Sequence, residues 1–199
     1  MNKPWSTADI PSQAGRRAVV TGANSGIGWH TALELARAGA EVIIPARTQA
    51  KADDACQRIR ALVPDAKIVT SIMDLTSLTS VRDFAAQQLA DQRPIDMLIN
   101  NAGVMALPRR KLSVDGFELQ FATNVLGHFL LTGLLLPAIL RAPAPAPRVV
   151  TVSSAAHMRG GPVPVTDLNS ETSYKPIRAY AKTKLENLLF ARELQRRAG

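Results

Sequence analysis

Cysteine is almost absent from the sequence: Cys56 is the single example among 199 residues. A disulfide needs two cysteines, and the common structural zinc sites use at least two, so both kinds of centre are excluded within this chain. The three histidines show no spacing typical of a metal site, and we predict no metal. Such cysteine usage is typical of reducing compartments, so we expect an intracellular, cytoplasmic protein.

Long uninterrupted apolar runs are also missing. The longest apolar stretch, residues 129–140, is broken by a threonine, a glycine and a proline. A transmembrane helix needs about 20 consecutive apolar residues, so we interpret this stretch as a buried helix and predict no membrane span. The first 13 residues contain Lys3, Asp9 and two prolines but no apolar run, unlike a secretory signal peptide.

Acidic residues are scarce: 16 Asp and Glu stand against 24 Lys and Arg, which gives a formal net charge of +8. A charge of this size is compatible with binding to nucleic acid or to an acidic membrane. However, the basic residues are scattered, and the densest cluster, Arg109, Arg110 and Lys111, has no interleaved aromatic residues to stack bases. We therefore interpret the charge as a solvated basic surface and predict no nucleic-acid partner.

Hydrophobic residues make up 46% of the chain, enough for one domain with a substantial core. Short β-branched runs alternate with longer helical patterns, which predicts an α/β fold with a doubly wound, Rossmann-like parallel sheet. The runs are almost continuously apolar, as expected for strands covered on both faces. The predicted strands are residues 18–21, 42–45, 67–73, 95–100 and 148–153. The predicted helices are residues 26–38, 48–62, 77–92, 117–140 and 179–197.

A glycine-rich turn, T-G-A-N-S-G-I-G at residues 21–28, follows the first predicted strand and precedes a helical pattern. In this order, backbone N–H groups and the helix dipole can hold a pyrophosphate. The spacing differs from the common G-x-G-x-x-G fingerprint and resembles T-G-x-x-x-G-I-G, the cofactor turn of the short-chain dehydrogenase/reductase family. By this resemblance, the cofactor-binding residues of the turn are Gly22, Asn24, Ser25, Gly26, Ile27 and Gly28.

Arg47 follows the second predicted strand, where a dinucleotide fold normally places an acidic residue that binds the adenosine ribose. A carboxylate would repel a 2′-phosphate, whereas a guanidinium can bind it through paired hydrogen bonds. Thr48 can cap the next helix and also contact this phosphate. We therefore predict NADP(H) rather than NAD(H) as the cofactor. In the alternative interpretation, Arg47 only begins the next helix in solvent.

Two further segments resemble cofactor motifs of the family. Asp74, followed by Leu75, matches the position that contacts the adenine amino group, although a role in a turn or helix N-terminus is the alternative. The sequence N-N-A-G at residues 100–103 resembles the family signature that stabilises the central sheet beside the cofactor. The resemblance thus adds Asp74, Leu75, Asn101, Ala102 and Gly103 to the cofactor site.

Tyr180 and Lys184 have the Y-x-x-x-K spacing of the family, which puts them on one helix face, one turn apart. A free tyrosine titrates near pH 10, so a fixed cation is needed to favour the phenolate at neutral pH. The resemblance implies that both also bind the cofactor, that Ser154 binds the substrate oxygen, and that Asn124 holds a proton-relay water. His128, on the same helical face as Asn124, is interpreted as a core or interface histidine.

The pattern F-x-x-N-x-L-G-H-F around Asn124 and the run Y-A-K-T-K-L-E-N-L-L-F from Tyr180 resemble the retinol-dehydrogenase-like branch of the family. This resemblance implies an NADP(H)-dependent oxidoreductase that interconverts a carbonyl and an alcohol on a small or lipophilic substrate. The alternative from another class is a non-catalytic NADP-binding sensor or scaffold, and the intact catalytic set counts against it.

We expect an N-terminal extension at residues 1–15 and a dinucleotide-binding oxidoreductase domain at residues 16–199. A six-stranded dinucleotide fold has the order 3-2-1-4-5-6, but only five strands are predicted here. Family members continue with further strands, so the resemblance implies a domain truncated at its C-terminus, whose fifth strand is an unprotected edge. Weak cofactor binding, slow turnover and self-association are expected of such a chain. The two long helices are candidate surfaces for a homo-oligomer.

Overall fold

The computed structural model describes residues 4–143 and 146–198; residues 1–3 of the predicted N-terminal extension and Gly199 lie outside the described residues. The strands are β1 (Arg17–Val20), β2 (Glu41–Ala46), β3 (Ile68–Ile72), β4 (Met97–Asn100) and β5 (Arg148–Thr151). The helices are α1 (Gly26–Arg37), α2 (Gln49–Leu62), α3 (Leu78–Ala90), α4 (Leu119–Phe121), α5 (Gly127–Leu140) and α6 (Pro176–Ala198). Three short helical turns complete the fold: η1 (Thr7–Asp9), η2 (Ala122–Leu126) and η3 (Ala155–Arg159).

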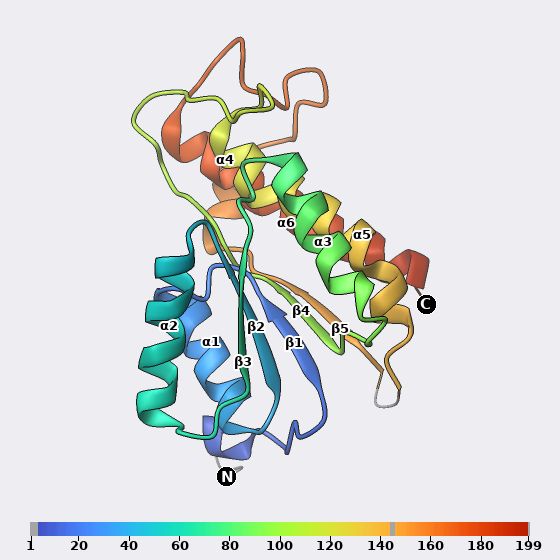
Figure 1. Ribbon diagram of the computed structural model, residues 1–199. Coiled ribbons are helices and arrows are strands. Elements are labelled where there is room, and N and C mark those ends of the chain that lie inside the picture. The colour runs from blue at the N-terminus through green and yellow to red at the C-terminus, as the bar shows by residue number, and fades with distance from the viewer. Residues whose placement is uncertain (1–3, 144–145, 199) are drawn as a thin grey trace.

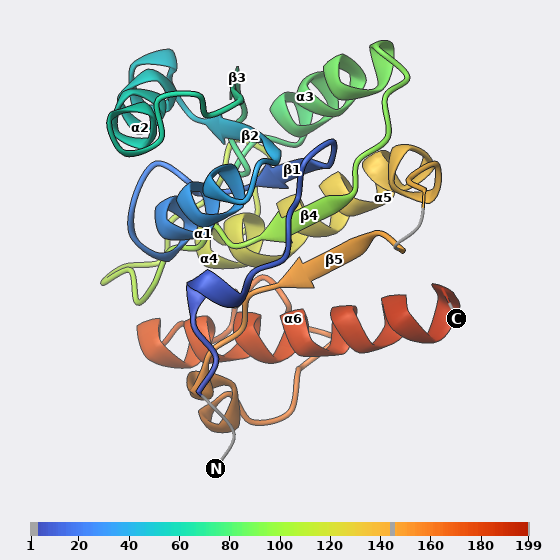
Figure 2. The ribbon, with the colours of Figure 1, turned by 90° about the horizontal axis from the view of Figure 1, so that it is seen from below.

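All five strands are parallel and lie in the order β3-β2-β1-β4-β5. Val20 and Ile44 of the central strands pack against α1 and α2, whereas Val19 and Ile43 pack against α3 and α5. Because successive side chains of a strand point to opposite faces, a strand covered on both faces must be apolar throughout. Figures 1 and 2 show the two helical layers on either side of the sheet. The predicted doubly wound α/β fold is therefore confirmed.

The prediction that every strand is covered on both faces is wrong for the two edge strands. β3 exposes Val69 and Ile72, and β5 exposes Val150. An edge strand lacks a neighbour on one side, and the helices that cover the sheet centre do not enclose it fully. The apolar content of these two runs therefore reflects β-propensity more than complete burial.

The helix predicted over residues 117–140 begins at Leu119 and is continuous to Leu140, but it is not a regular α-helix throughout. The structure has the short helix α4, then the π-helical turn η2, and only then the regular helix α5. A π-helical turn contains more residues than an α-helical turn, and such turns are frequent at functional sites. Asn124 lies in the middle of this turn. Hydrophobic periodicity did not reveal the change, because Ala122, Thr123 and Asn124 are all buried.

Leu119–Leu140 is the one helical stretch of the described chain whose length and composition would suit a membrane crossing. Half of its most apolar part is buried inside the protein, however, and Leu131 and Leu135 pack in the core beside α3. A buried core helix can have the same length and the same apolar composition. The structure thus places this stretch as the core helix that the sequence predicts.

Candidate active site

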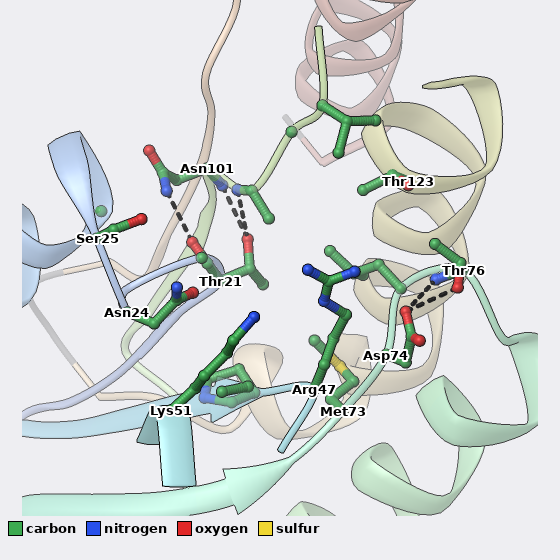
Figure 3. A pocket seen from close by; sticks show the side chains of 18 of the residues that line it. Thr21, Asn24, Ser25, Arg47, Lys51, Met73, Asp74, Thr76, Asn101 and Thr123 are labelled. Carbon is green, nitrogen blue, oxygen red and sulfur yellow. Dashed lines mark hydrogen bonds between the residues drawn. The ribbon is translucent and has the colours of Figure 1, made fainter. Parts of the chain in front are cut away.

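A cleft of about 380 Å³ opens at the carboxyl ends of the strands (Figure 3). Parallel strands end at a common edge, where open α/β sheets bind their ligands. Gly26, which begins α1 with a φ of 55°, is the one predicted cofactor-turn residue that does not line it. The predicted cofactor residues that line it are Gly22, Asn24, Ser25, Ile27, Gly28, Arg47, Asp74, Leu75, Asn101, Ala102 and Gly103.

The glycine-rich turn packs directly against the segment that follows β4. A Cβ atom on Gly28 would lie 2.3 Å from Nδ2 of Asn101, and one on Gly22 would lie 2.9 Å from Cα of Ala102. Asn101 Nδ2 donates a hydrogen bond of 2.8 Å to the carbonyl oxygen of Thr21. Both glycines are therefore required by close packing. The N-terminus of α1, which favours anions, lies at the cleft in a geometry suited to a pyrophosphate.

Arg47 and Lys51 bring two positive charges to the side of the cleft at the end of β2, and Figure 3 shows both side chains projecting into it. Both residues are exposed, and neither has an ion-pair partner among the described residues. Thr48 caps α2 through a 3.4 Å hydrogen bond from the backbone N–H of Lys51, as predicted. Lys51 was not predicted from the sequence, although its position four residues after Arg47 was an available signal.

Asp74 has the turn role that was the alternative prediction, and it also lines the cleft. Its Oδ1 accepts hydrogen bonds from the backbone N–H of Thr76 at 2.9 Å and from Thr76 Oγ1 at 2.8 Å. Its own backbone N–H donates to Ser80 Oγ at 3.0 Å. These contacts fix the path of the chain from β3 to α3. Any contact with an adenine must therefore use what remains of the carboxylate's accepting capacity.

Lys184 lies beside both Tyr180 and the cleft. Its Nζ is 5.7 Å from the centroid of the Tyr180 ring and donates a 3.0 Å hydrogen bond to the carbonyl oxygen of Val152. A Cβ atom on Gly103 would lie 3.6 Å from the same Nζ. Lys184 is only 4% exposed, and this burial lowers its pKa. The buried ammonium group therefore lies near both the Tyr180 ring and Gly103, which lines the cleft.

Asn124 is fully buried, and its side chain joins three segments. Oδ1 accepts from the backbone N–H of Val104 at 2.8 Å, and Nδ2 donates to the Val104 carbonyl at 3.0 Å and to Thr183 Oγ1 at 3.0 Å. The side-chain amide of Asn124 thus forms a bridge between the segment after β4 and α6.

Ser154 has a different role in the structure. Its Oγ accepts a hydrogen bond of 3.2 Å from the backbone N–H of Ala156 and caps η3.

The four predicted catalytic residues are brought together only in part. None of them lines the cleft, and among the described residues no hydrogen bond joins Ser154 to Tyr180. Asn124 and Lys184 nevertheless lie beside Gly103, which lines the cleft. A Cβ atom added to Gly103 would lie 3.2 Å from Asn124 Oδ1 and 3.6 Å from Lys184 Nζ. The lining residues that were not predicted from the sequence are Thr21, Pro45, Ala46, Lys51, Met73, Thr76, Val104, Leu119 and Thr123.

The family model described as short chain dehydrogenase matches residues 16–166. The chain belongs to this family. Retinol dehydrogenase 14 of Mus musculus is 45% identical over 193 residues, which cover 92% of this chain and 57% of the relative. The resemblance to the retinol-dehydrogenase-like branch is therefore confirmed. This short-chain dehydrogenase spans little more than half the length of that relative.

Solved structures show the same fold. The crystal structure of an uncharacterized protein from Mycobacterium paratuberculosis has a TM-score of 0.85 and 47% identity, covering 98% of this chain and 67% of that one. Pseudomonas aeruginosa RhlG, solved as an active-site complex with NADP, has a TM-score of 0.73 and 30% identity, covering 94% and 68%. The arrangement of sheet and helices therefore follows other short-chain dehydrogenases over nearly the whole chain.

Proposed function

We propose that this short-chain dehydrogenase is an NADP(H)-dependent oxidoreductase that interconverts a carbonyl and an alcohol. The observation that carries the proposal is the position of Lys184, whose buried Nζ lies beside both the Tyr180 ring and Gly103 of the cleft. A fixed cation there can stabilise the negative charge that develops on the tyrosine oxygen while a proton is transferred. The similarity to a retinol dehydrogenase supports a lipophilic substrate.

In the proposed reaction, Tyr180 donates a proton to the substrate oxygen during reduction and accepts it during oxidation. Ser154 orients that oxygen, and Lys184 stabilises the phenolate and binds the nicotinamide ribose. A bound nicotinamide supplies or accepts the hydride. Asn124 keeps the segment after β4 and α6 in register through its bonds to Val104 and Thr183. These roles need no metal, and the described residues contain no cluster of three or more potential metal ligands.

The direct test is oxidation of NADPH by the purified protein in the presence of a panel of aldehydes and ketones, including lipophilic ones. Turnover that depends on both cofactor and carbonyl supports the proposal. Saturable NADPH binding without turnover of any panel member would instead favour a non-catalytic NADP-binding sensor or scaffold. Titration with both cofactors, followed by fluorescence, separates binding from chemistry.

Arg47→Asp should reverse or narrow the preference for NADPH over NADH. Arg47 and Lys51 are exposed cations that line the cleft, and neither has an ion-pair partner within residues 4–143 and 146–198. A hydrogen bond to a charged group contributes about 1.5–3 kcal/mol, so NADPH affinity should fall at least about tenfold. NADH affinity should change less, because it carries no 2′-phosphate. Arg82→Asp, the same charge change on the exposed face of α3, should leave both affinities unchanged. Equal affinities of the wild-type protein for NADPH and NADH would contradict the prediction.

We also propose that α5 and α6 form the contact of a homodimer. Most side chains of α5 are apolar, and two of them are exposed: Phe129 is 60% exposed and Leu140 is 70% exposed. Gly133 lies between them on α5, and a Cβ there would meet open space, so a second helix can approach closely. Phe129 also contacts the ring of Phe190, with centroids 5.6 Å apart, which extends the apolar surface to α6. A second copy would cover this surface with one of the same kind.

Phe129→Glu should convert a dimer to a monomer, because it places a charge in the centre of the proposed contact. Light scattering after size-exclusion chromatography measures the change. Val114→Glu, at a loop residue that is 81% exposed, should leave the dimer intact. A monomeric wild-type protein, or binding of the wild-type protein to neutral lipid vesicles through Phe129, would contradict the proposed dimer.

A further inference from the structure

His128 lies at the start of α5 and is only 1% exposed, yet both of its ring nitrogens have partners. Nδ1 is 3.1 Å from the carbonyl oxygen of Asn124, in the π-helical turn η2. Nε2 is 2.8 Å from Oγ1 of Thr21, which follows β1 and is 107 residues away in the sequence. The imidazole therefore joins the turn that contains the predicted catalytic Asn124 to the first residue of the cofactor turn.

The direction of each hydrogen bond follows from the partners of the ring. A carbonyl oxygen can only accept, so Nδ1 carries the hydrogen and donates it to Asn124. Burial, with a smaller contribution from the charge of Lys184, lowers the pKa of His128 to about 4, so the ring is neutral at pH 7. Nε2 of a neutral ring that is protonated on Nδ1 is an acceptor. Thr21 must therefore donate its hydroxyl hydrogen to His128.

Thr21 has one hydroxyl hydrogen and two acceptors within reach. His128 Nε2 is 2.8 Å away, whereas the carbonyl oxygen of Ile99 is 3.2 Å away. When the hydrogen points to the imidazole, the Oγ1 lone pairs accept the backbone N–H groups of Asn101 at 2.9 Å and Ala102 at 3.0 Å. The hydroxyl then has one donor bond and two acceptor bonds, its full capacity. Asn101 and Ala102 line the cleft, so this relay ends at the cofactor side of the site.

We propose that His128 is a positioning residue that couples the cofactor segment to the catalytic segment. The continuous path runs from the Asn101 and Ala102 amides through Thr21 to the imidazole, and on to the Asn124 carbonyl. The Asn124 side chain extends it to Val104. This role rests on the proposed reductase function for its kinetic consequence. The hydrogen-bond path itself can be tested without turnover.

His128→Phe tests the proposal, because it keeps a flat ring in the cavity and removes both hydrogen bonds. Turnover should fall about tenfold, equivalent to about 1.4 kcal/mol of activation free energy, while KM for the carbonyl substrate changes little. In the protein without cofactor, amide hydrogen exchange of Asn101, Ala102 and Val104 should become faster, because their hydrogen-bond anchor is loosened. Thr21→Val combined with His128→Phe should lower turnover no more than either change alone.

Thr132→Val is the matched control, one turn further along α5. Thr132 is 2% exposed, donates to the His128 carbonyl at 2.8 Å and accepts from Asn100 Nδ2 at 3.0 Å, so its loss also removes buried hydrogen bonds. This variant should lower Tm, as should His128→Phe, but should keep the wild-type turnover and the wild-type exchange of residues 101–104. The control separates coupling from general destabilisation.

The measurements are made well below Tm and expressed per folded molecule. Wild-type exchange of residues 101–104 together with wild-type turnover in His128→Phe would overturn the proposal and leave His128 as a core residue only. If the wild-type protein reduces no carbonyl, the proposed function fails, but the exchange measurement still decides whether His128 anchors the cofactor segment. Equal acceleration of exchange in the Thr132→Val control would also overturn the coupling.

Discussion

Tyr180→Phe is expected to abolish carbonyl reduction while the fold and the affinity for NADPH stay close to wild type. The change removes one hydroxyl group and leaves the ring beside Lys184, whose Nζ is 5.7 Å from its centroid. A positioned general acid contributes about 10²–10⁴ in rate, so turnover should fall at least about a hundredfold. NADPH oxidation with a carbonyl substrate measures the rate, and fluorescence titration measures the affinity.

Tyr174→Phe is the matched control, because it removes the other tyrosine hydroxyl of the chain. Tyr174 donates a 2.7 Å hydrogen bond to the Leu107 carbonyl and accepts a 3.0 Å bond from Gln120 Nε2. Burial raises the pKa of Tyr174, which makes it a poorer acid. This variant should lose some stability and keep its turnover. Wild-type turnover in Tyr180→Phe would show that another group, such as Tyr174 or His157, supplies the proton.

Part of the lining of the cleft could be predicted from signals that are local in the sequence. The turn around Gly22 and Gly28 needs residues without side chains, since a Cβ on either would meet Ala102 or Asn101. Arg47 directly follows a strand, and the parallel strand order then brings it to the same sheet edge as the turn. Short-range patterns and one topological rule thus placed the turn and Arg47 at this edge, whereas Asp74, Leu75, Asn101, Ala102 and Gly103 were predicted from the resemblance to the family.

The burial of charged side chains on α6, the helix that carries Tyr180 and Lys184, could not be predicted from such patterns. Lys182 is only 6% exposed, and its Nζ donates to the carbonyls of Asp167 and Leu168 and to Ser170 Oγ, at 3.2, 2.9 and 3.0 Å. Charged residues on a helix normally mark its solvent face. Here the loop before α6 covers that face, and its path is set by contacts between distant segments. The burial of Lys182 and Glu186 was therefore invisible in the sequence.

Glu186, on α6, is a buried ionisable residue. Its side chain is buried, with the residue only 8% exposed, and neither carboxyl oxygen has a hydrogen-bond partner among the described residues. Burial raises the pKa of Glu186 from 4.5 to about 7; Lys182 opposes this rise and Glu118 adds to it. A buried carboxylate without hydrogen bonds is costly, so the folded state favours the protonated form.

The pH dependence that follows has a definite sign. The pKa of Glu186 is higher in the folded state, so between about pH 4.5 and pH 7 the folded state binds more protons than the unfolded state. The contribution of this group to stability is therefore fully present below pH 4.5 and is lost as the pH rises through 7. The rise in pKa corresponds to a loss of about 3 kcal/mol, at about 1.4 kcal/mol per pKa unit.

Glu186→Gln is therefore expected to raise the free energy of unfolding by up to about 3 kcal/mol at pH 8 and to change it little at pH 4.5. Urea unfolding at the two pH values measures both differences. Glu193→Gln makes the same charge change on the same helix, where hydrogen bonds from Arg196 and Arg197 lower the pKa of Glu193 to about 2. Its effect should have the opposite sign, a small loss of stability at pH 8. Equal stability of wild-type protein and Glu186→Gln at pH 8 would show that water or a local rearrangement satisfies the buried carboxylate.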